Sequence, residues 1–187
     1  GLGNTTDYSS PKQVGLLTDW FSISCESSCE SAIKTDGTLW AWGAGALGQL
    51  GLGNATYYSS PKQVGALTNW STQTSLYNWS TLAIKTDGSL WSWGYNSTGQ
   101  LGLGNTTTYS SPKQVGFLTD WAKIGGANDC ATAIKTDGTL WSWGGNGNGQ
   151  LGLGSVSASS SPNQVGSATN WTNVFDGGDA MSAAIRS

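Results

Sequence analysis

The chain repeats one sequence pattern every 50 or 51 residues, and this period limits the folds that it can adopt. The pentapeptide Ile-Lys-Thr-Asp-Gly at residues 33–37 returns at residues 84–88 and 134–138. The same period is kept by a set of tryptophans and prolines: Trp20, Trp70, Trp121 and Trp171, and Pro11, Pro61, Pro112 and Pro162. A fixed period of this length indicates an array of small supersecondary units, each too small to bury its own apolar face.

Within each unit the sequence predicts short strands. In the unit that begins at Trp121, residues 131–136 and 139–143 flank Asp137-Gly138, a strong signal for a hairpin with a two-residue turn. A further run starts at Pro162, and its proline suits an outer edge strand. Four short strands with recurring Trp and Gly are typical of a propeller blade, so the predicted fold is all-β, a β-propeller of four-stranded blades.

The units predict one partial β-propeller over residues 1–187, with about 3.7 repeats. Its units are residues 1–50, 51–101, 102–151 and an incomplete 152–187. Three complete units and the last, shorter one predict 15 strands, including an N-terminal outer strand near Pro11–Val14. Because exposed strand edges invite pairing, we expect further blades or other chains to complete the ring.

Composition excludes several classes of partner. Only 10% of the residues are charged, the net charge is −3, and no cluster of Lys and Arg occurs, so nucleic-acid binding is not expected. No apolar run approaches the roughly 18 residues that span a bilayer, so membrane insertion is not expected either. The 11 tryptophans provide large apolar surfaces for a core.

Catalysis is not expected, because the chain contains no His and therefore no Ser-His-Asp triad. The repeated Asp36, Asp87 and Asp137 are interpreted as turn residues, and the repeated Lys34, Lys85 and Lys135 as exposed strand positions. Three cysteines are too few for a disulfide framework. For Cys25 and Cys29 a local bridge and free thiols both stay open. We expect no cofactor and no metal, because the sequence at 176–179 lacks the further ligands that calcium needs.

The repeated sequence resembles a known repeat, and the resemblance covers the whole chain. Residues 133–144 read Ala-Ile-Lys-Thr-Asp-Gly-Thr-Leu-Trp-Ser-Trp-Gly, followed by Gly-Gln-Leu-Gly-Leu-Gly at 149–154 and Ser-Pro-Asn-Gln-Val at 161–165. This string resembles the repeat of the regulator-of-chromosome-condensation family. The resemblance implies a propeller of about seven blades, part of which this chain would form. Family members serve as an exchange factor for a small GTPase, an ultraviolet receptor and enzyme inhibitors, and fold alone selects none of these roles.

Comparison of the units separates scaffold from variable segments. The variable segments are residues 21–31, 71–82, 122–132 and 172–183, which we expect to be loops on one face. They hold the predicted ligand-binding residues: Trp79, Tyr77, Asn78, Phe21, Glu26, Glu30, Asn128, Asp129, Asp176 and Asp179.

Trp79 is the tryptophan that departs from the repeat. With Tyr77 and Asn78 it predicts an aromatic and polar patch for a sugar ring or a protein contact, and packing against a neighbouring blade is the alternative. The acidic residues favour a basic partner, or are ordinary solvated loop charges.

The sequence thus predicts a non-catalytic recognition or adhesion propeller that binds a glycan or protein. Because the near-identity of the units resembles viral or bacterial surface propellers, an extracellular or virion-surface location is expected. Two alternatives stay open, a secreted enzyme inhibitor and a structural tile of a larger assembly.

Overall fold

The computed structural model describes residues 1–16, 18–77, 79–177 and 183–186, and its regular elements are 14 strands. These are β1 (Trp20–Glu26), β2 (Cys29–Lys34), β3 (Leu39–Gly43), β4 (Tyr58–Gln63), β5 (Trp70–Tyr77), β6 (Ser80–Lys85), β7 (Leu90–Gly94), β8 (Tyr109–Gln114), β9 (Trp121–Ala127), β10 (Cys130–Lys135), β11 (Leu140–Gly144), β12 (Ser159–Gln164), β13 (Trp171–Phe175) and β14 (Ala183–Arg186). They form three four-stranded antiparallel sheets in chain order and the pair β13–β14. The predicted blades are confirmed, and we number them 1 to 4.

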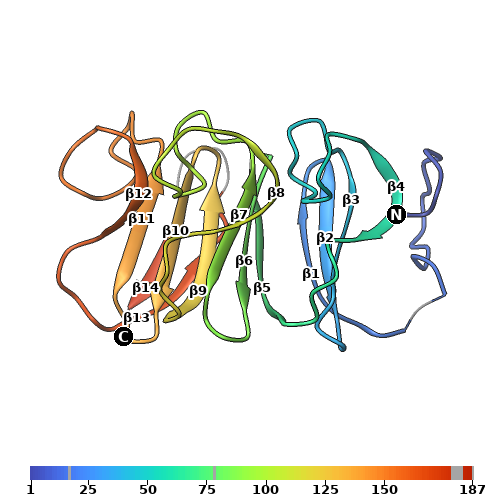
Figure 1. Cartoon of the computed structure of the whole chain (residues 1–187), viewed down its shortest axis with the longest axis horizontal. Coiled ribbons are helices and arrows are strands. Elements are labelled where there is room, and N and C mark those ends of the chain that lie inside the picture. The colour runs from blue at the N-terminus through green and yellow to red at the C-terminus, as the bar shows by residue number, and fades with distance from the viewer. Residues whose placement is uncertain (17, 78, 178–182, 187) are drawn as a thin grey trace.

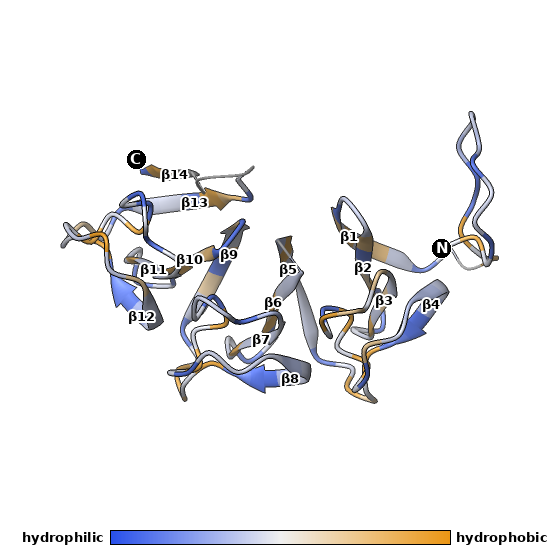
Figure 2. Cartoon of the chain, turned by 90° about the horizontal axis from the view of Figure 1, so that it is seen from above, coloured by the Kyte–Doolittle hydropathy of each residue, from blue (hydrophilic) through white to orange (hydrophobic). Residues whose placement is uncertain are grey.

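The blades stand side by side as an open arc (Figure 1), and Figure 2 shows this arc from above. The first strands, β1, β5, β9 and β13, line its inner side, and the proline-bearing strands β4, β8 and β12 lie outside. The outer position of the proline strands is therefore confirmed, although Pro61 lies within β4 rather than at its start.

The variable segments are mostly strand, which differs from the predicted loops. Residues 21–31, for example, complete β1, make a short turn and begin β2. Strand pairing uses backbone groups that every residue except proline carries, so a sequence can vary along an inner strand without losing the ladder.

The Asp-Gly turns are longer than the predicted two-residue turn. Gly138 N donates to Lys135 O at 3.0 Å, and Lys135 N donates to Thr139 O at 3.0 Å. Gly138 alone in the turn has a positive φ, +78°, which is the pattern of a type I turn closed by a glycine bulge. Asp137 Oδ1 accepts from Thr139 N at 2.9 Å and from Thr139 Oγ1 at 2.7 Å, so the interpretation of these aspartates as turn residues is confirmed.

Large and small residues fit together between blades. Trp143 is fully buried, and its Nε1 donates to Gln100 O of the preceding blade at 2.9 Å. A Cβ on Gly102 would lie 2.8 Å from that Nε1, so only glycine lets the backbone approach the indole. Gln100 Oε1 accepts from Thr98 N at 3.0 Å, which confirms that the repeated glutamines satisfy loop backbone groups.

The repeated lysines are buried, and their prediction as exposed positions is wrong. Lys34, Lys85 and Lys135 are each 7% exposed. Lys85 Nζ lies 3.6 Å from the centroid of the Trp91 ring and 5.1 Å from that of Trp70. A lysine can bury its aliphatic stem on apolar surface, and the indole faces attract its ammonium.

Blade 2 differs from blades 1 and 3 beside this lysine. Lys34 and Lys135 pair with Asp19 and Asp120 at 3.4 and 3.3 Å. The corresponding residue of blade 2 is Asn69, which carries no charge, and burial lowers the pKa of Lys85 from its usual value of 10.5.

The N-terminal segment is not the predicted strand, so the described residues hold 14 strands rather than 15. The outer strands β4, β8 and β12 each pair with the third strand of their own blade. No strand of that kind is described before β1, so residues 11–14 have no partner strand. The segment instead packs on blade 1: a Cβ on Gly1 would lie 2.8 Å from Trp42 Nε1, and Gly3 N donates to Ser59 O at 2.8 Å.

Candidate recognition surface

The turns between the first and second strands of the blades gather on one edge of the arc. Each turn accepts a hydrogen bond from the residue after its third strand: Ala44 N to Ser28 O at 2.8 Å, Tyr95 N to Trp79 O at 2.9 Å and Gly145 N to Asp129 O at 2.7 Å. Because the sheets are antiparallel, the Asp-Gly turns occupy the opposite edge. We call the edge that holds residues 27–28, 79 and 128–129 the tip edge. It carries the longest loops in Figure 1.

Trp79 projects from the tip edge on an unusual backbone. Its φ is +61° and its side chain is 44% exposed, although bulky residues rarely adopt positive φ. Its ring meets the edge of the Tyr95 ring at 6.4 Å between centroids and 82° between planes. Trp79 therefore packs on an aromatic residue of its own blade and keeps part of its surface in solvent.

The turn that carries Trp79 is closely held. A Cβ on Gly94 would lie 2.3 Å from Trp79 O, and Ser80 Oγ donates to Tyr95 O at 2.7 Å. Backbone strain of about 1–3 kcal/mol persists only where the surrounding structure fixes it. The neighbouring residues thus fix the backbone of the turn from which the Trp79 indole projects.

Tyr77 does not join the predicted patch with Trp79. It is 3% exposed, and its hydroxyl donates to Gln100 O at 2.8 Å. Its ring fills the space where a Cβ on Gly126 would lie 2.3 Å away, so Tyr77 belongs to the junction of blades 2 and 3. Burial raises its pKa well above 10. Asn78, the third residue of that patch, lies outside the described residues.

The acidic candidates are spread over different surroundings. Glu26, at the end of β1, accepts from Ser27 Oγ at 2.8 Å. Glu30 lies on β2 in a half-buried position, and burial raises the pKa of its carboxyl. Asn128, with a φ of +33°, is exposed, and Asp129 beside it is half-buried at the tip of blade 3. Two carboxylates, Glu26 and Asp129, thus stand at the tips on either side of blade 2.

Asp176 ties the end of β13 to two other blades. Its Oδ1 accepts from Ser75 Oγ of β5 and from Gly126 N of β9 at 3.0 Å, and Gly177 N donates to Gly126 O at 2.8 Å. This role of Asp176 was not predictable from the sequence, because its partners lie 101 and 50 residues away. Asp179 lies outside the described residues.

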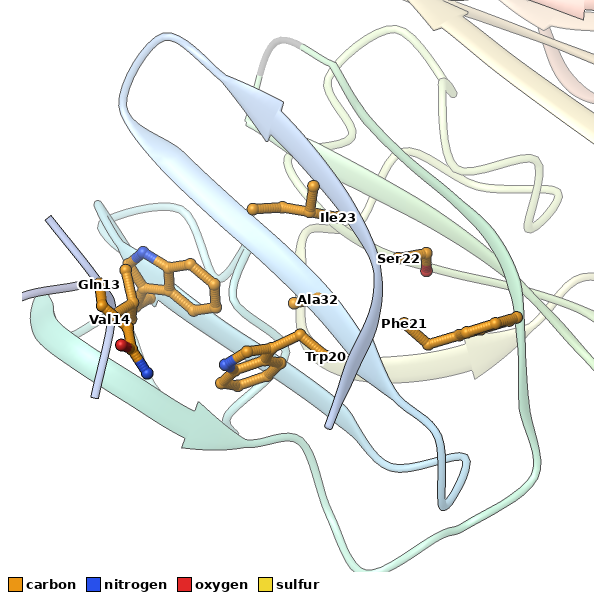
Figure 3. A pocket seen from close by; sticks show the side chains of 8 residues that line it. Gln13, Val14, Trp20, Phe21, Ser22, Ile23 and Ala32 are labelled. Atoms are coloured by element: carbon orange, nitrogen blue, oxygen red, sulfur yellow. The ribbon is translucent and has the colours of Figure 1, made fainter. Parts of the chain in front are cut away.

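Phe21 lies away from the tips, in a cavity on blade 1. The cavity has a volume of about 320 Å³, and Trp20, Phe21, Ile23 and Ala32 line it (Figure 3). Two clefts of about the same volume recur between blades, one beside Trp70 and Trp91 and one beside Trp121 and Trp141. Sequence reasoning missed these spaces, because they arise where neighbouring units meet.

The described residues offer little for catalysis or metal binding. They contain no group of three or more His, Cys, Asp and Glu residues that could hold a metal ion. The three cysteines are free, so Cys25 and Cys29 form no bridge here. Burial raises the pKa of Cys29 to about 12 and that of Cys130 to about 11, which makes both thiols poor nucleophiles. The described residues contain no helix that is long and apolar enough to cross a membrane.

Comparison with known proteins gives one repeat family. The regulator of chromosome condensation (RCC1) repeat matches residues 36–84, 87–134 and 137–185. Human HERC6, a probable E3 ubiquitin-protein ligase, is 34% identical over 58% of this chain but only 11% of its own length. The human E3 ubiquitin-protein ligase HERC2 is 30% identical over 64% of the chain and 3% of its own length. RUG3, a mitochondrial RCC1 domain-containing protein of Arabidopsis thaliana, is 31% identical over 65% of the chain and 28% of its length.

Solved structures agree with this match at the level of fold. Prp20p from Saccharomyces cerevisiae superposes with a TM-score of 0.80 at 18% identity, over 92% of this chain and 45% of that one. Human WBSCR16 gives a TM-score of 0.55 at 18% identity, over 90% of this chain and 58% of that one. The chain thus spans about half of each of these proteins.

Proposed function

This chain belongs to the RCC1-repeat family, and from that premise we propose that it is a non-catalytic module that recognises a protein through its tip edge. One similar protein binds other proteins: Prp20p has been studied for its binding to Gsp1p and histones, and was solved bound to Kap60. The proposal transfers the class of ligand, a protein, and none of those particular partners.

The observation that carries the proposal is the position of Trp79. Ten of the eleven tryptophans follow the repeat, and Trp79 does not. At the corresponding tip positions blades 1 and 3 carry Ser28 and Asp129. A partly exposed indole that packs against Tyr95 is the kind of aromatic anchor that dominates protein interfaces.

Charge around the anchor indicates the chemistry of the partner. Glu26 and Asp129 stand at the tips of the blades on either side of Trp79, and the whole chain has a net charge of −3. Complementary charge speeds and directs association. We therefore propose a basic segment of a protein as the ligand.

The setting of this recognition is part of the proposal. We place the protein outside a cell or on a virion surface, in an adhesion role, because the near-identity of its units is typical of such propellers. An exposed indole also suits stacking on a sugar ring, so a glycan is the second candidate ligand. An enzyme inhibitor would use the same edge against an active site, and a structural tile would need no ligand.

The test is selection against a displayed library of random peptides, in parallel with a glycan array. We expect the protein to enrich peptides with Lys or Arg beside an apolar residue, and we expect Trp79→Ser to lose that enrichment. Phe117→Ser is the matched control, because Phe117 is 96% exposed and lies far from the tips, after β8. If the array shows glycan binding that depends on Trp79, and no peptide is enriched, the ligand of this site is a glycan rather than a protein. Equal enrichment by both variants would remove Trp79 from the site.

A further inference from the structure

A cavity at the junction of blades 1 and 2 lies on the edge opposite the tip edge. It has a volume of about 450 Å³, and the turn residues Asp36 and Gly37 line it. Blades 1 and 2 each have all four of their strands, so complete blades form both walls. Trp70 N donates to Gly37 O at 3.2 Å across the junction, and a Cβ on Gly37 would collide with Thr68 O. The cavity is therefore a fixed part of the junction.

One wall of the cavity carries an aromatic residue that departs from the repeat. Phe21 is the bulge residue of β1, left unpaired between Trp20 and Ser22, and blade 3 carries Ala122 at the corresponding place. Figure 3 shows Phe21 extending from β1 toward the green chain of blade 2, and its side chain lines the cavity. Blade 1 thus adds a ring to this cavity where blade 3 has only a methyl group.

The wall from blade 2 carries an insertion. The spacing between the first-strand tryptophan and the second-strand lysine is 15 residues in blade 2 and 14 residues in blades 1 and 3. The extra residue lies in β5, where residues 71–73 are left out of the pairing with β6. Ser71 Oγ accepts from Gln73 N at 3.3 Å within this bulge, and Ser71 and Thr72 line the cavity. Because bulges re-aim side chains and are frequent beside functional sites, two separate departures from the repeat at one cavity indicate a site.

The polar groups of the cavity are hydroxyls and a carboxylate. Five residues supply the hydroxyls: Thr35, Thr68, Ser71, Thr72 and Thr86. Asp36 supplies the carboxylate, and its Oδ1 accepts from Thr38 N at 2.9 Å and from Thr38 Oγ1 at 2.7 Å. These bonds use Oδ1, so Oδ2 keeps its capacity to accept. They also lower the pKa of Asp36 below its usual 3.8, so the carboxylate is charged at neutral pH.

The lysine that lines the cavity is already engaged by its own blade. Lys34 Nζ lies 3.4 Å from Asp19 Oδ2 and 4.6 Å from the centroid of the Trp40 ring, and Lys34 is 7% exposed. Asp36 is therefore the exposed charge among the residues that line the cavity. A negative charge repels anions, so an acidic ligand is not favoured here.

We propose that this cavity binds an uncharged pyranose residue of a saccharide, with one face of the sugar ring on Phe21 and its hydroxyls bonded to Asp36 and the β5 bulge. The negative face of an aromatic ring suits the C–H groups of a sugar face. A carboxylate accepts charge-assisted hydrogen bonds from sugar hydroxyls, and protein hydroxyls both donate and accept. The volume lies within the range of small-molecule sites, about 300–1,000 Å³. This site is separate from Trp79 and does not depend on the tip edge.

Two-dimensional NMR of the isotope-labelled chain, titrated with the methyl glycosides of glucose, galactose, mannose and N-acetylglucosamine, tests the proposal. We expect at least one glycoside to shift the backbone amides of residues 35–37 and 71–73, with a dissociation constant on the order of 1 mM. Phe21→Ala, which installs the residue type of blade 3, should abolish these shifts. Asp36→Asn should weaken binding about tenfold, because the amide lacks the charge. Its Oδ1 can still accept from Thr38, so the turn is retained.

Phe117→Ala is the matched control, because it removes an exposed phenylalanine outside the cavity and should bind like wild type. Phe21 and Phe117 are both exposed, so the circular dichroism of both variants should match wild type. Tetramethylammonium chloride, titrated in parallel, probes for a cation site, since Phe21 and Asp36 would also attract a cation.

The proposal is overturned if no glycoside shifts these amides at concentrations up to roughly 50 mM, or if Phe21→Ala responds like wild type. It is also overturned if tetramethylammonium binds and no glycoside does. Glycoside shifts confined to the turn of Trp79 would overturn it as well, and would assign the sugar to the tip edge.

Discussion

Trp143 and Trp79 show two uses of the same side chain in one molecule. Trp143 is fully buried between blades and donates its Nε1 hydrogen to Gln100 O. Trp79 stands on the tip edge with 44% of its surface exposed and a backbone held at φ +61°. The first follows the repeat and holds blades together, whereas the second departs from it and leaves its surface available. Positions that repeat therefore carry the fold, and Trp79, which departs from the repeat, is the position at which we propose that recognition occurs.

The largest expected effect comes from truncating the two tryptophans in turn. Trp143→Ala should lower the free energy of unfolding by about 3–5 kcal/mol, because it leaves a large cavity between blades. Trp79→Ala should change it by about 1 kcal/mol or less, because the side chain is exposed and a strained position is released. Urea unfolding followed by circular dichroism measures both. Similar losses in the two variants would erase the distinction between scaffold and tip.

Glycines that face the scaffold tryptophans should be nearly as sensitive. Gly102→Ala should lower the free energy of unfolding by about 2–4 kcal/mol, since the new methyl group would lie 2.8 Å from Trp143 Nε1 and the φ of Gly102 is +71°. Gly116→Ala is the matched control, with a φ of +62° and no atom within 4 Å. It should lose only the backbone part, about 1–2 kcal/mol. Equal losses would mean that the indole contact is unimportant.

A smaller change in stability is expected at the buried lysines, where a neighbouring carboxylate can be added in blade 2 or removed in blade 3. Asn69→Asp should give Lys85 the carboxylate that Asp120 gives Lys135, raising the pKa of Lys85 and stabilising the fold by up to about 1 kcal/mol. Asp120→Asn should remove the ion pair of Lys135 and destabilise blade 3 by up to about 1 kcal/mol. NMR titration of the lysine side chains measures the pKa values, and a Lys85 pKa that stays unchanged in Asn69→Asp would contradict the account.

The smallest expected effect is a difference in pH dependence between turn and blade face. Hydrogen bonds from Thr139 lower the pKa of Asp137 below its usual 3.8, so its stabilising effect is full above pH 3.8 and is lost as pH falls through the lower value. Burial raises the pKa of Glu30 above 4.5, so its contribution is full below pH 4.5 and is lost as pH rises through the higher value. The free energy of unfolding, measured between pH 2 and 7, should therefore contain two contributions with opposite slopes. Asp137→Asn should remove the contribution that rises with pH, and Glu30→Gln should remove the one that falls with pH. Slopes of the same sign would contradict these assignments.

The sequence predicted the blades and the positions of their Asp-Gly turns, although not the length of these turns, because both depend on local patterns that the repeat displays several times. Pairing with distant residues was not predictable in this way. Tyr77 looks exposed beside Trp79, and only the approach of Gly126 from the next blade buries it. The sequence predicts Lys85 as an exposed lysine, but the indoles of two separate strands cover it. The tie made by Asp176 joins three blades and leaves no mark in any one repeat.

Hydroxyl-radical footprinting of the eleven tryptophans, read by mass spectrometry, tests the central distinction most directly. Trp79 should be oxidised at the highest rate, while Trp93 and Trp143, which are 1% and 0% exposed, should be the most protected. Oxidation of Trp93 and Trp143 at the same rate as Trp79 would contradict the stacked blades and the exposed tip together.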